Sequence, residues 1–467
     1  MQIAVVGSGY VGLVAAACFA ELGNDVICVD NDSSKLAALQ RGEIPIHEKF
    51  LPELVARQRG RRLFFSGSVE RAVRASQVIF IAVGTPSRTN GECDLSFVEG
   101  VSREIGRALN GCKIIVEKST VPVCTSDWIR KIMLLNGAPR SSFEVASNPE
   151  FLREGTAVTD FLYPDRIVIG ADNASCAGVL RKLYEPLILR TYARQKDAVP
   201  APDDAPSVPQ LIVTSAKSAE LIKHASNAFL AMKISFINAV ANICEAVGAN
   251  VEEVCEGVGS DRRIGKRFLA PGIGYGGSCF PKDLKAFRAV AGEAGYDFRL
   301  LDEVIRINDE QCARFLRKVR SALWTLKGKR IAVLGLAFKG GTDDIRESPA
   351  LDLVRVLVRE RADVIAYDPA ANERAREVLP EEGVSFGDNP YDVASGADAL
   401  LILTDWEEFA ALDLDRLRNE LKYPIVIDGR NLYSPELMAE LGFMYFSVGR
   451  PDVLPKERDL TRLKKAG

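Results

Sequence analysis

The sequence predicts an α/β protein with two Rossmann-like, doubly wound sheets joined by a central long helix. Three observations support this fold class. The first thirty residues read as a strand, a glycine-rich turn, a helix and a second strand, which is the order of a βαβ unit. A similar pattern recurs from Arg330 onward. Between the two patterns, residues 216–247 contain neither Pro nor Gly, as expected of one long helix.

The N-terminal unit begins with an apolar strand at residues 3–6, followed by Gly7-Ser8-Gly9-Tyr10-Val11-Gly12. A helix is expected at 13–22 and a second strand at 26–29, which ends at Asp30. The glycines allow a tight turn that brings a pyrophosphate to the helix N-terminus, and Asp30 can accept hydrogen bonds from ribose hydroxyls. Because a carboxylate repels a 2′-phosphate, the pattern predicts NAD rather than NADP. A glycine-rich turn that only packs a helix on a sheet is the alternative.

Further strands of this unit are expected at residues 78–83, 113–117 and 143–146, and they end in the segments 84–86, 119–122 and 148–150. In an open parallel sheet, ligands bind beyond the carboxyl ends of the strands. Thr120 and Glu150 are therefore expected to meet a substrate near the nicotinamide.

The middle of the chain contains a proline-rich segment and the long helix. Residues 197–210 carry four prolines and predict an exposed, irregular, mobile loop. The helix at 216–247 should end near Gly248, and its polar residues form a narrow stripe: Glu220, Lys223, Asn227, Asn238, Asn242 and Glu245. The stripe is either a solvated face or, at Lys223 and Asn227, an i, i+4 pair that grips one ligand. The apolar remainder predicts burial on most sides and a subunit interface.

The C-terminal part repeats the first: residues 330–335, 363–368 and 399–403 echo 2–7, 25–30 and 78–82. It keeps only Gly335 of the fingerprint, so a second NAD is not expected and the mononucleotide part of a substrate is the better prediction. Lys339, Arg346 and Arg430 follow its strands, where cations suit phosphates, although exposed charge on a solvated loop is the alternative. The predicted domains are 1–210, 211–320 and 321–467.

One cysteine has an unusual setting, the segment GGSCFPKD at 276–283. The two glycines permit close backbone approach to a ligand, and Pro281 can open a helix whose dipole, with Lys282, stabilises the Cys279 thiolate. The alternative is a small buried hydrophobe. The other nine cysteines, for example Cys18, Cys28, Cys244 and Cys255, lie in apolar or helical contexts and are predicted to belong to the core.

Composition excludes several classes of function. The 467 residues are 47% hydrophobic with a net charge of −3, which predicts a globular protein without a basic field for nucleic acid. We expect no signal peptide and no segment long and apolar enough to span a bilayer. Ten cysteines without CxxC pairs predict reduced thiols in the cytoplasm. With His47 and His224 as the only histidines, neither a zinc site nor a Ser-His-Asp triad is expected, and no metal is predicted.

Taken in order, the motifs resemble those of the nucleotide-sugar dehydrogenases. They are GSGYVG from Gly7, GTP from Gly84, STVPV from Ser119, NPEFLREG from Asn148, ELIKHASNAFLA with Lys223 and Asn227, GGSCFPKD from Gly276, FKGGTDDIRESP from Phe338 and DGRNLYSP from Asp428. The resemblance implies two NAD-dependent oxidations at C6 of a UDP-sugar, UDP-glucose to UDP-glucuronate. GDP-mannose or a UDP-N-acetylhexosamine is the alternative substrate.

The resemblance also implies roles. Cys279 attacks an aldehyde, and the thiohemiacetal becomes a thioester that water hydrolyses. Lys223 and Asn227 stabilise the oxyanion, Thr120 and Asp283 hold a water, and Glu150 helps to accept protons. The implied cofactor contacts are Gly7, Gly9, Tyr10, Val11, Gly12, Asp30, Lys35, Thr85, Thr120, Glu154, Lys282 and Arg346. The implied substrate contacts are Glu150, Phe151, Leu152, Lys223, Asn227, Arg263, Phe268, Tyr275, Gly276, Lys339 and Arg430. Arg263 would reach a neighbouring subunit, in a homodimer formed through the central helix.

The sequence departs from the family pattern in two places. Cys124 replaces a small glycine often found after STVPV, and the proline-rich loop is longer than expected. Two other functions stay open: a single-step hydroxyacid or hydroxyacyl-thioester dehydrogenase, which yields one NADH and does not need Cys279, and a redox-sensing NAD-binding module without turnover.

Overall fold

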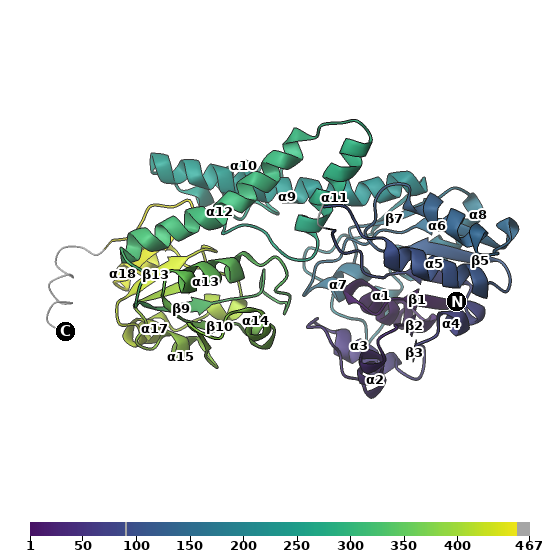
Figure 1. The fold of residues 1–467 in the computed structure, drawn as a ribbon, viewed down its shortest axis with the longest axis horizontal. Coiled ribbons are helices and arrows are strands. Elements are labelled where there is room, and N and C mark those ends of the chain that lie inside the picture. Colours follow the sequence, from purple (N-terminus) through teal and green to yellow (C-terminus); the bar gives the residue numbers. More distant parts are fainter. Residues whose placement is uncertain (89–90, 455–467) are drawn as a thin grey trace. The chain divides into compact units, whose positions relative to one another are not determined.

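The computed structural model describes residues 1–88 and 91–454, and these fall into two compact units. The first unit contains residues 1–226 and 285–296, and the second contains 227–284 and the chain from 297 onward. Each unit is built on one sheet with helices packed beside its strands (Figure 1).

The first unit holds an eight-stranded sheet in the order β3-β2-β1-β4-β5-β6-β7-β8. Its strands are β1 (Gln2–Val6), β2 (Asp25–Val29), β3 (Leu63–Ser66), β4 (Val78–Ile81), β5 (Lys113–Glu117), β6 (Phe143–Ser147), β7 (Arg166–Ala171) and β8 (Gln210–Thr214). The first six are parallel in Rossmann order, with Val6 opposite both Val29 and Ile81. The sheet continues with β7, which is antiparallel to β6, and with β8, which is parallel to β7. Sequence patterns did not predict these last two strands.

The core of this unit forms around an alanine-rich helix. The helices are α1 (Tyr10–Glu21), α2 (Ser33–Arg41), α3 (Leu51–Gln58), α4 (Val69–Ala75), α5 (Ser96–Ala108), α6 (Thr125–Leu135), α7 (Ala157–Leu162) and α8 (Ala174–Ile188). Small side chains let α1 approach the sheet closely, so every residue from Gly12 to Glu21 is buried. Phe19 anchors this packing, with its ring 4.9 Å from that of Phe80 and 5.1 Å from that of Phe161.

The second unit holds a six-stranded, all-parallel sheet in the order β11-β10-β9-β12-β13-β14, which confirms the predicted second Rossmann-like sheet. Its strands are β9 (Arg330–Leu334), β10 (Asp363–Tyr367), β11 (Val384–Phe386), β12 (Ala399–Ile402), β13 (Ile425–Asp428) and β14 (Met444–Ser447). Its flanking helices are α13 (Pro349–Arg359), α14 (Asn372–Val378), α15 (Pro390–Ala394), α16 (Glu407–Ala410), α17 (Leu414–Glu420) and α18 (Pro435–Glu440). Gly335 (φ 95°) donates its N–H to Tyr367 at 2.8 Å, as Gly7 (φ 103°) does to Val29 at 2.8 Å.

The long helix α9 spans Ala216–Val247, as the sequence predicts. It is followed by α10 (Val251–Gly259), α11 (Phe280–Glu293) and α12 (Arg299–Leu323). The expected burial of its apolar sides is wrong for the single chain. Phe229, Phe236 and Ile243 are 54–62% exposed, whereas the polar Lys223 and Asn238 are at most 4% exposed. Four residues of the polar stripe turn inward because the rest of the chain offers them partners; for example, Asn238 Oδ1 accepts the Gly272 N–H at 2.8 Å. The other two are less buried, since Asn242 is half-buried and Glu245 is exposed.

The expectation that no segment is long and apolar enough to span a bilayer also needs correction. Helix α9 meets that test by length and composition. A core helix or an interface helix can have the same length and composition. The criterion alone is therefore weak evidence for a membrane span.

Two cysteines change the expected picture of these thiols. Cys112, which precedes β5 in a loop, is exposed, so the prediction that the nine other cysteines belong to the core fails there. Cys124, at the glycine position after STVPV, has φ 76°, a left-handed conformation that glycine adopts without strain. None of the ten cysteines, all of which lie within the described residues, forms a disulfide.

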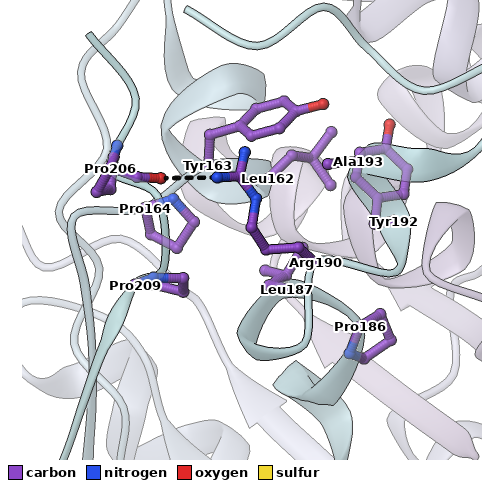
Figure 2. A pocket seen from close by; sticks show the side chains of 10 residues that line it. All are labelled: Leu162, Tyr163, Pro164, Pro186, Leu187, Arg190, Tyr192, Ala193, Pro206 and Pro209. Atoms are coloured by element: carbon purple, nitrogen blue, oxygen red, sulfur yellow. Dashed lines mark hydrogen bonds between the residues drawn. The ribbon is translucent and has the colours of Figure 1, made fainter.

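The proline-rich segment has no regular secondary structure between Arg194 and Gln210, as predicted, but the protein anchors it. Val199 is 5% exposed, and its N–H donates to the Tyr192 hydroxyl at 2.9 Å. Figure 2 shows Arg190 reaching towards the Pro206 carbonyl beside Tyr163 and Pro164, with an N to O distance of 3.4 Å. These contacts hold the loop against α7 and α8.

Candidate functional site

The glycine-rich turn of the first unit separates two kinds of glycine. A Cβ on Gly12 would lie 1.9 Å from the Gly7 carbonyl oxygen, and a Cβ on Gly7 would lie 2.4 Å from the Ala82 oxygen, so both are required by packing. Gly9 has extended backbone (φ −68°, ψ −172°) and no protein atom within 4 Å of an added Cβ. Its missing side chain leaves open space at the N-terminus of α1, where an anionic ligand is favoured.

Asp30 lies at the end of β2 beside this turn. Its Oδ2 accepts from the Ser8 N–H at 2.9 Å and from the Ser8 hydroxyl at 2.6 Å, and it pairs with Lys35 Nζ at 3.2 Å. Burial alone would raise the pKa of Asp30, but the hydrogen bonds from Ser8 and Asp32, with Lys35, lower it to about 2. The carboxylate is therefore ionised at neutral pH, as recognition of ribose hydroxyls requires.

A buried carboxylate that sequence reasoning missed ties the fingerprint to a distant loop. The Tyr10 hydroxyl donates to Glu48 Oε2, which also accepts the Gly155 N–H at 2.8 Å. Glu48 Oε1 accepts from the Val158 N–H at 3.4 Å, so this carboxyl lies at the N-terminus of α7. Glu154, an implied cofactor contact, belongs to the loop that Glu48 holds. In the sequence, Glu48 is one of three polar residues between Ile46 and Phe50, and nothing local distinguishes it from its neighbours.

The segments after β4 and β5 are joined by two side-chain hydroxyl groups. The buried Thr85 donates its hydroxyl to the Thr120 carbonyl at 2.9 Å, and Ser119 donates to the Val83 carbonyl at 2.8 Å. Thr120 itself is half-buried. These bonds bring the GTP and STVPV motifs to one edge of the first sheet, as the parallel topology predicted.

Glu150 and Lys223 form a buried ion pair in the first unit. Their Oε1 and Nζ atoms are 2.9 Å apart, and each side chain is 5% exposed. Glu150 Oε2 accepts the Leu152 N–H at 2.6 Å, and the Arg166 guanidinium lies 3.8 Å above the Phe151 ring. Removal of one partner of such a pair leaves a buried charge uncompensated, at a cost of about 3–5 kcal/mol.

A second buried lysine, Lys118, was also missed. It is 3% exposed, and its Nζ donates to Asn148 Oδ1 at 3.1 Å, beside a hydrogen bond from Tyr184 to the same oxygen. Burial lowers the pKa of Lys118 to about 8, against the opposing effect of the carboxylate of Glu150. A lysine directly after an apolar strand and before Ser119 was the only signal in the sequence.

In the second unit, Cys279 directly precedes α11, whose first hydrogen bond runs from the Asp283 N–H to the Cys279 carbonyl at 2.8 Å. The predicted helix N-terminus is confirmed. The preceding glycines are required by the chain itself, because a Cβ on Gly276 would lie 2.1 Å from the Glu347 oxygen and one on Gly277 (φ 85°) would lie 2.8 Å from the Phe338 ring. This packing holds Cys279, which is half-buried, at the start of the helix.

One turn into α11, the buried carboxylate of Asp283 joins two neighbours. Its Oδ2 accepts from Asn227 Nδ2 at 2.6 Å, and its Oδ1 pairs with Lys282 Nζ at 2.7 Å. Asn227 lies one turn after Lys223 on α9, so the helix itself sets the spacing between these two side chains.

The implied nucleotide-sugar contacts of the second unit fall into two groups. Tyr275 is buried, its ring packs edge-on against Phe280 at 5.7 Å, and Phe268 (φ 65°) lies 6.2 Å from Phe280. Arg430 follows β13 and donates to the Leu403 carbonyl at 2.9 Å and the Phe338 carbonyl at 3.1 Å.

Three other residues of the predicted site, all cationic, have contacts with residues near them in sequence. Lys339 lies 5.6 Å from the Phe338 ring centre. The Arg263 side chain is 87% exposed and pairs with Asp261 at 2.6 Å, and the Arg346 side chain is 62% exposed and pairs with Asp344 at 2.6 Å. Both arginines therefore pair with a carboxylate on their own loop.

Comparison with known proteins agrees with this arrangement. Three models of the UDP-glucose/GDP-mannose dehydrogenase family match the chain: the NAD binding domain over residues 1–188, the central domain over 217–310 and the UDP binding domain over 332–435. The chain is 46% identical to UDP-glucose 6-dehydrogenase TuaD of Bacillus subtilis (strain 168), over 97% of this chain and 94% of that protein. The chain belongs to the UDP-glucose/GDP-mannose dehydrogenase family.

Two more family members agree. The UDP-glucose 6-dehydrogenase of Rhizobium meliloti (strain 1021) is 47% identical over 97% of this chain and 100% of its own length. The structure of a UDP-glucose dehydrogenase from the archaeon Pyrobaculum islandicum superposes with a TM-score of 0.85 at 36% identity, over 96% of this chain and 98% of that one. Within the family's NAD binding domain, the open space at Gly9 and the ionised Asp30 fit the pyrophosphate and adenosine ribose of NAD.

The two kinds of glycine predict different mutant behaviour. Gly9→Ala should leave the melting temperature of the free protein nearly unchanged but weaken NAD binding by about tenfold or more, because the methyl group occupies the pyrophosphate's approach. Gly12→Ala should destabilise the free protein by about 1–3 kcal/mol, because its methyl group meets the Gly7 backbone. Calorimetric titration with NAD and thermal unfolding measure the two effects. Equal losses of stability in both variants would contradict the distinction.

Glu48 predicts a pH dependence of stability. Burial raises the pKa of Glu48 to about 7, with Asp160 adding to the effect. Because the folded state then holds a proton that the unfolded state releases, this group's stabilisation is present below its unfolded pKa and is lost as pH rises towards 7. Glu48→Gln removes this titration.

Between pH 5 and pH 8, the stability of Glu48→Gln relative to the unmodified protein should therefore rise, by on the order of 2 kcal/mol. Urea unfolding at both pH values measures it, with Glu53→Gln on the exposed side of α3 as the control. An unchanged difference between the two pH values would show that Glu48 is ionised in the folded protein throughout this range.

Proposed function

We propose that this protein oxidises C6 of UDP-glucose twice, with NAD as the acceptor, to give UDP-glucuronate. The observation that carries the proposal is Cys279, half-buried at the N-terminus of α11 behind two glycines that admit no side chain. The 46–47% identity to UDP-glucose 6-dehydrogenases, over nearly the whole chain, supports this choice of sugar. We assign NAD binding, the central helices and UDP-sugar binding to residues 1–210, 211–320 and 321–467.

Cys279 supplies the covalent step. The N-terminus of α11 favours a thiolate, and the thiolate adds to the C6 aldehyde to form a thiohemiacetal. This adduct holds the aldehyde on the protein and converts its carbon into a second alcohol-like donor. Bound NAD supplies the hydride acceptor for both oxidations. The resulting thioester is hydrolysed by water, and the Cys279 thiolate returns.

The side chains of α9 serve the oxygen at C6. Lys223 places a positive charge where the alkoxide develops, and its 2.9 Å pair with Glu150 keeps it oriented. Asn227 adds an amide donor one turn away, positioned by its 2.6 Å bond to Asp283. Glu150 accepts a proton when the alcohol is oxidised, and Thr120 with Asp283 orients the hydrolytic water.

The second sheet binds the nucleotide end. Loops after its parallel strands carry Lys339 and Arg430, which suit a diphosphate. Tyr275, Phe268 and Gly276 lie on the segment that leads to Cys279, so a sugar held by this segment would be close to the thiolate along the chain. Ten cysteines without a disulfide among the described residues fit a reducing compartment, and we place the enzyme in the cytoplasm.

Product counting tests this function. With limiting UDP-glucose and excess NAD, the protein should form two NADH per sugar, and GDP-mannose should give none. Cys279→Ser should lower steady-state turnover by about 10³-fold or more while NAD affinity stays unchanged. A serine hydroxyl adds to the aldehyde less readily than a thiolate, and the ester it would form is hydrolysed less readily than a thioester. One NADH per sugar would indicate a single-step dehydrogenase, and NAD binding without turnover would indicate a sensor module.

We also propose a homodimer through α9. Phe229, Phe236 and Ile243 recur every seven residues, and Val247 follows one turn later, all between 54% and 71% exposed. Seven-residue spacing is the pattern of two helices packed along each other, and exposed apolar surface of this extent marks an interface. A second copy of α9 supplies the same stripe, since a two-fold interface pairs one patch with itself.

Phe236→Glu tests the dimer. It should convert the protein to monomers at micromolar concentration, because the two-fold axis brings two new carboxylates into an apolar contact. Phe97→Glu is the matched control, since Phe97 on α5 is similarly exposed, at 53% against 54%. Sedimentation velocity measures both. A dimer that persists in Phe236→Glu would place the interface elsewhere.

A further inference from the structure

The second unit has a basic depression that plays no part in the proposed reaction. Its volume is about 380 Å³. The lining includes Arg320, Trp324 and Lys327, at and after the end of α12, and Arg359, Glu360 and Arg361, at the end of α13.

The depression lies at the amino ends of strands of the second sheet, whereas the predicted UDP-sugar loops lie at the carboxyl ends. Its residues directly precede β9 at Arg330 and β10 at Asp363, so they lie at the amino ends of these parallel strands. Lys339 and Arg430 follow β9 and β13, at the carboxyl ends, where ligands of such sheets bind. The two locations are therefore distinct.

The charge of the depression is opposite to that of the whole chain. Four cationic side chains and one carboxylate line it, a net charge of +3 in a protein whose net charge is −3. Glu360 is paired with Arg320. Within residues 1–88 and 91–454, Lys327, Arg359 and Arg361 form no ion pair, so three cations are available to an anion.

Two of the lining residues have a strained backbone conformation. Trp324 (φ 61°) and Arg361 (φ 63°) are both left-handed, and Trp324 is 95% exposed. The turn at Arg361 repeats the one at Gly23 (φ 92°) in the first unit: the N–H of Arg361 donates to Val358 at 2.8 Å, as that of Gly23 donates to Ala20 at 3.0 Å. A glycine would adopt this conformation without strain, and the chain carries an arginine instead.

We propose that this depression binds a nucleoside triphosphate. The exposed indole of Trp324 offers a face on which a base can stack. Lys327, Arg359 and Arg361 offer donors to phosphate oxygens, and a net charge of +3 complements a triphosphate better than a monophosphate. The volume of the depression is also within the size range of small-molecule sites.

Equilibrium dialysis of labelled ATP against the full-length protein tests the proposal. Any ATP that binds at the carboxyl ends of the sheets should bind equally to all variants. Differences in ATP binding between the variants therefore report on the depression alone. We expect about one ATP to bind at the depression of each chain. Its affinity should fall by about tenfold or more in Arg359→Ala, Arg361→Gly and Trp324→Ala. Arg314→Ala, an exposed arginine of α12 outside the lining, should bind ATP normally.

Two further measurements separate the alternatives. Arg361→Gly should melt at or above the temperature of the unmodified protein, which shows that its lost binding is not lost folding. ATP should also quench tryptophan fluorescence of the unmodified protein, and this quenching should be absent in Trp324→Phe. The proposal is overturned if all variants bind ATP alike, or if inorganic triphosphate binds as tightly as ATP with no effect of Trp324→Ala. It is equally overturned if anionic phosphatidylglycerol vesicles, but not ATP, distinguish these variants.

Discussion

The buried polar side of α9 is the constraint on which the rest of the molecule depends. Glu220, Lys223, Asn227 and Asn238 are each at most 6% exposed, and burying such groups is costly unless each finds a partner. Each residue has one: Glu220 accepts the N–H groups of Cys124 and Ser126 at 2.6 and 2.8 Å, and Lys223 pairs with Glu150. Asn227 donates to Asp283, and Asn238 Oδ1 accepts the Gly272 N–H at 2.8 Å. These partners tie the helix to the motifs that flank it. The helix therefore presents apolar residues outward, which is the source of the proposed dimer.

The two sheets share a topology but differ in the ligand that each is suited to bind. The first six strands of the first sheet and the six strands of the second follow the same order, and both sheets place a left-handed glycine after the first strand. In the first, Gly9 leaves open space at a helix N-terminus. In the second, Asp368 Oδ2 accepts the N–H groups of Leu336 and Ala337 at 2.8 and 3.0 Å, so the chain's own carboxylate engages the turn. In the first unit, Asp30 Oδ2 accepts the Ser8 N–H in the same way, so it is the open space at Gly9, and not the carboxylate, that suits the first sheet to a dinucleotide pyrophosphate.

Local patterns predicted much of the fold and part of the site. The glycine fingerprint, the bounds of α9 and the repeat of the βαβ pattern are local features, because each depends on side-chain period or on glycine at set positions. Glu48 and Lys118 could not be found in this way. Their partners lie more than 100 and about 30 residues away, and their local sequence gives little sign of these contacts. The antiparallel strand β7 was missed for a similar reason, since strand direction depends on pairing across the sheet.

By itself, the sequence determined the α/β class, the NAD fingerprint, the long helix and a cysteine at a helix start. These follow from periodicity and from the backbone freedom of particular residues. Only the tertiary structure decided which face of α9 is buried, which glycines pack and which leave space, and which carboxylates hold lysines and loops in place. Those outcomes depend on contacts between distant segments. The same polar stripe is solvated or buried according to whether the rest of the chain offers it a partner.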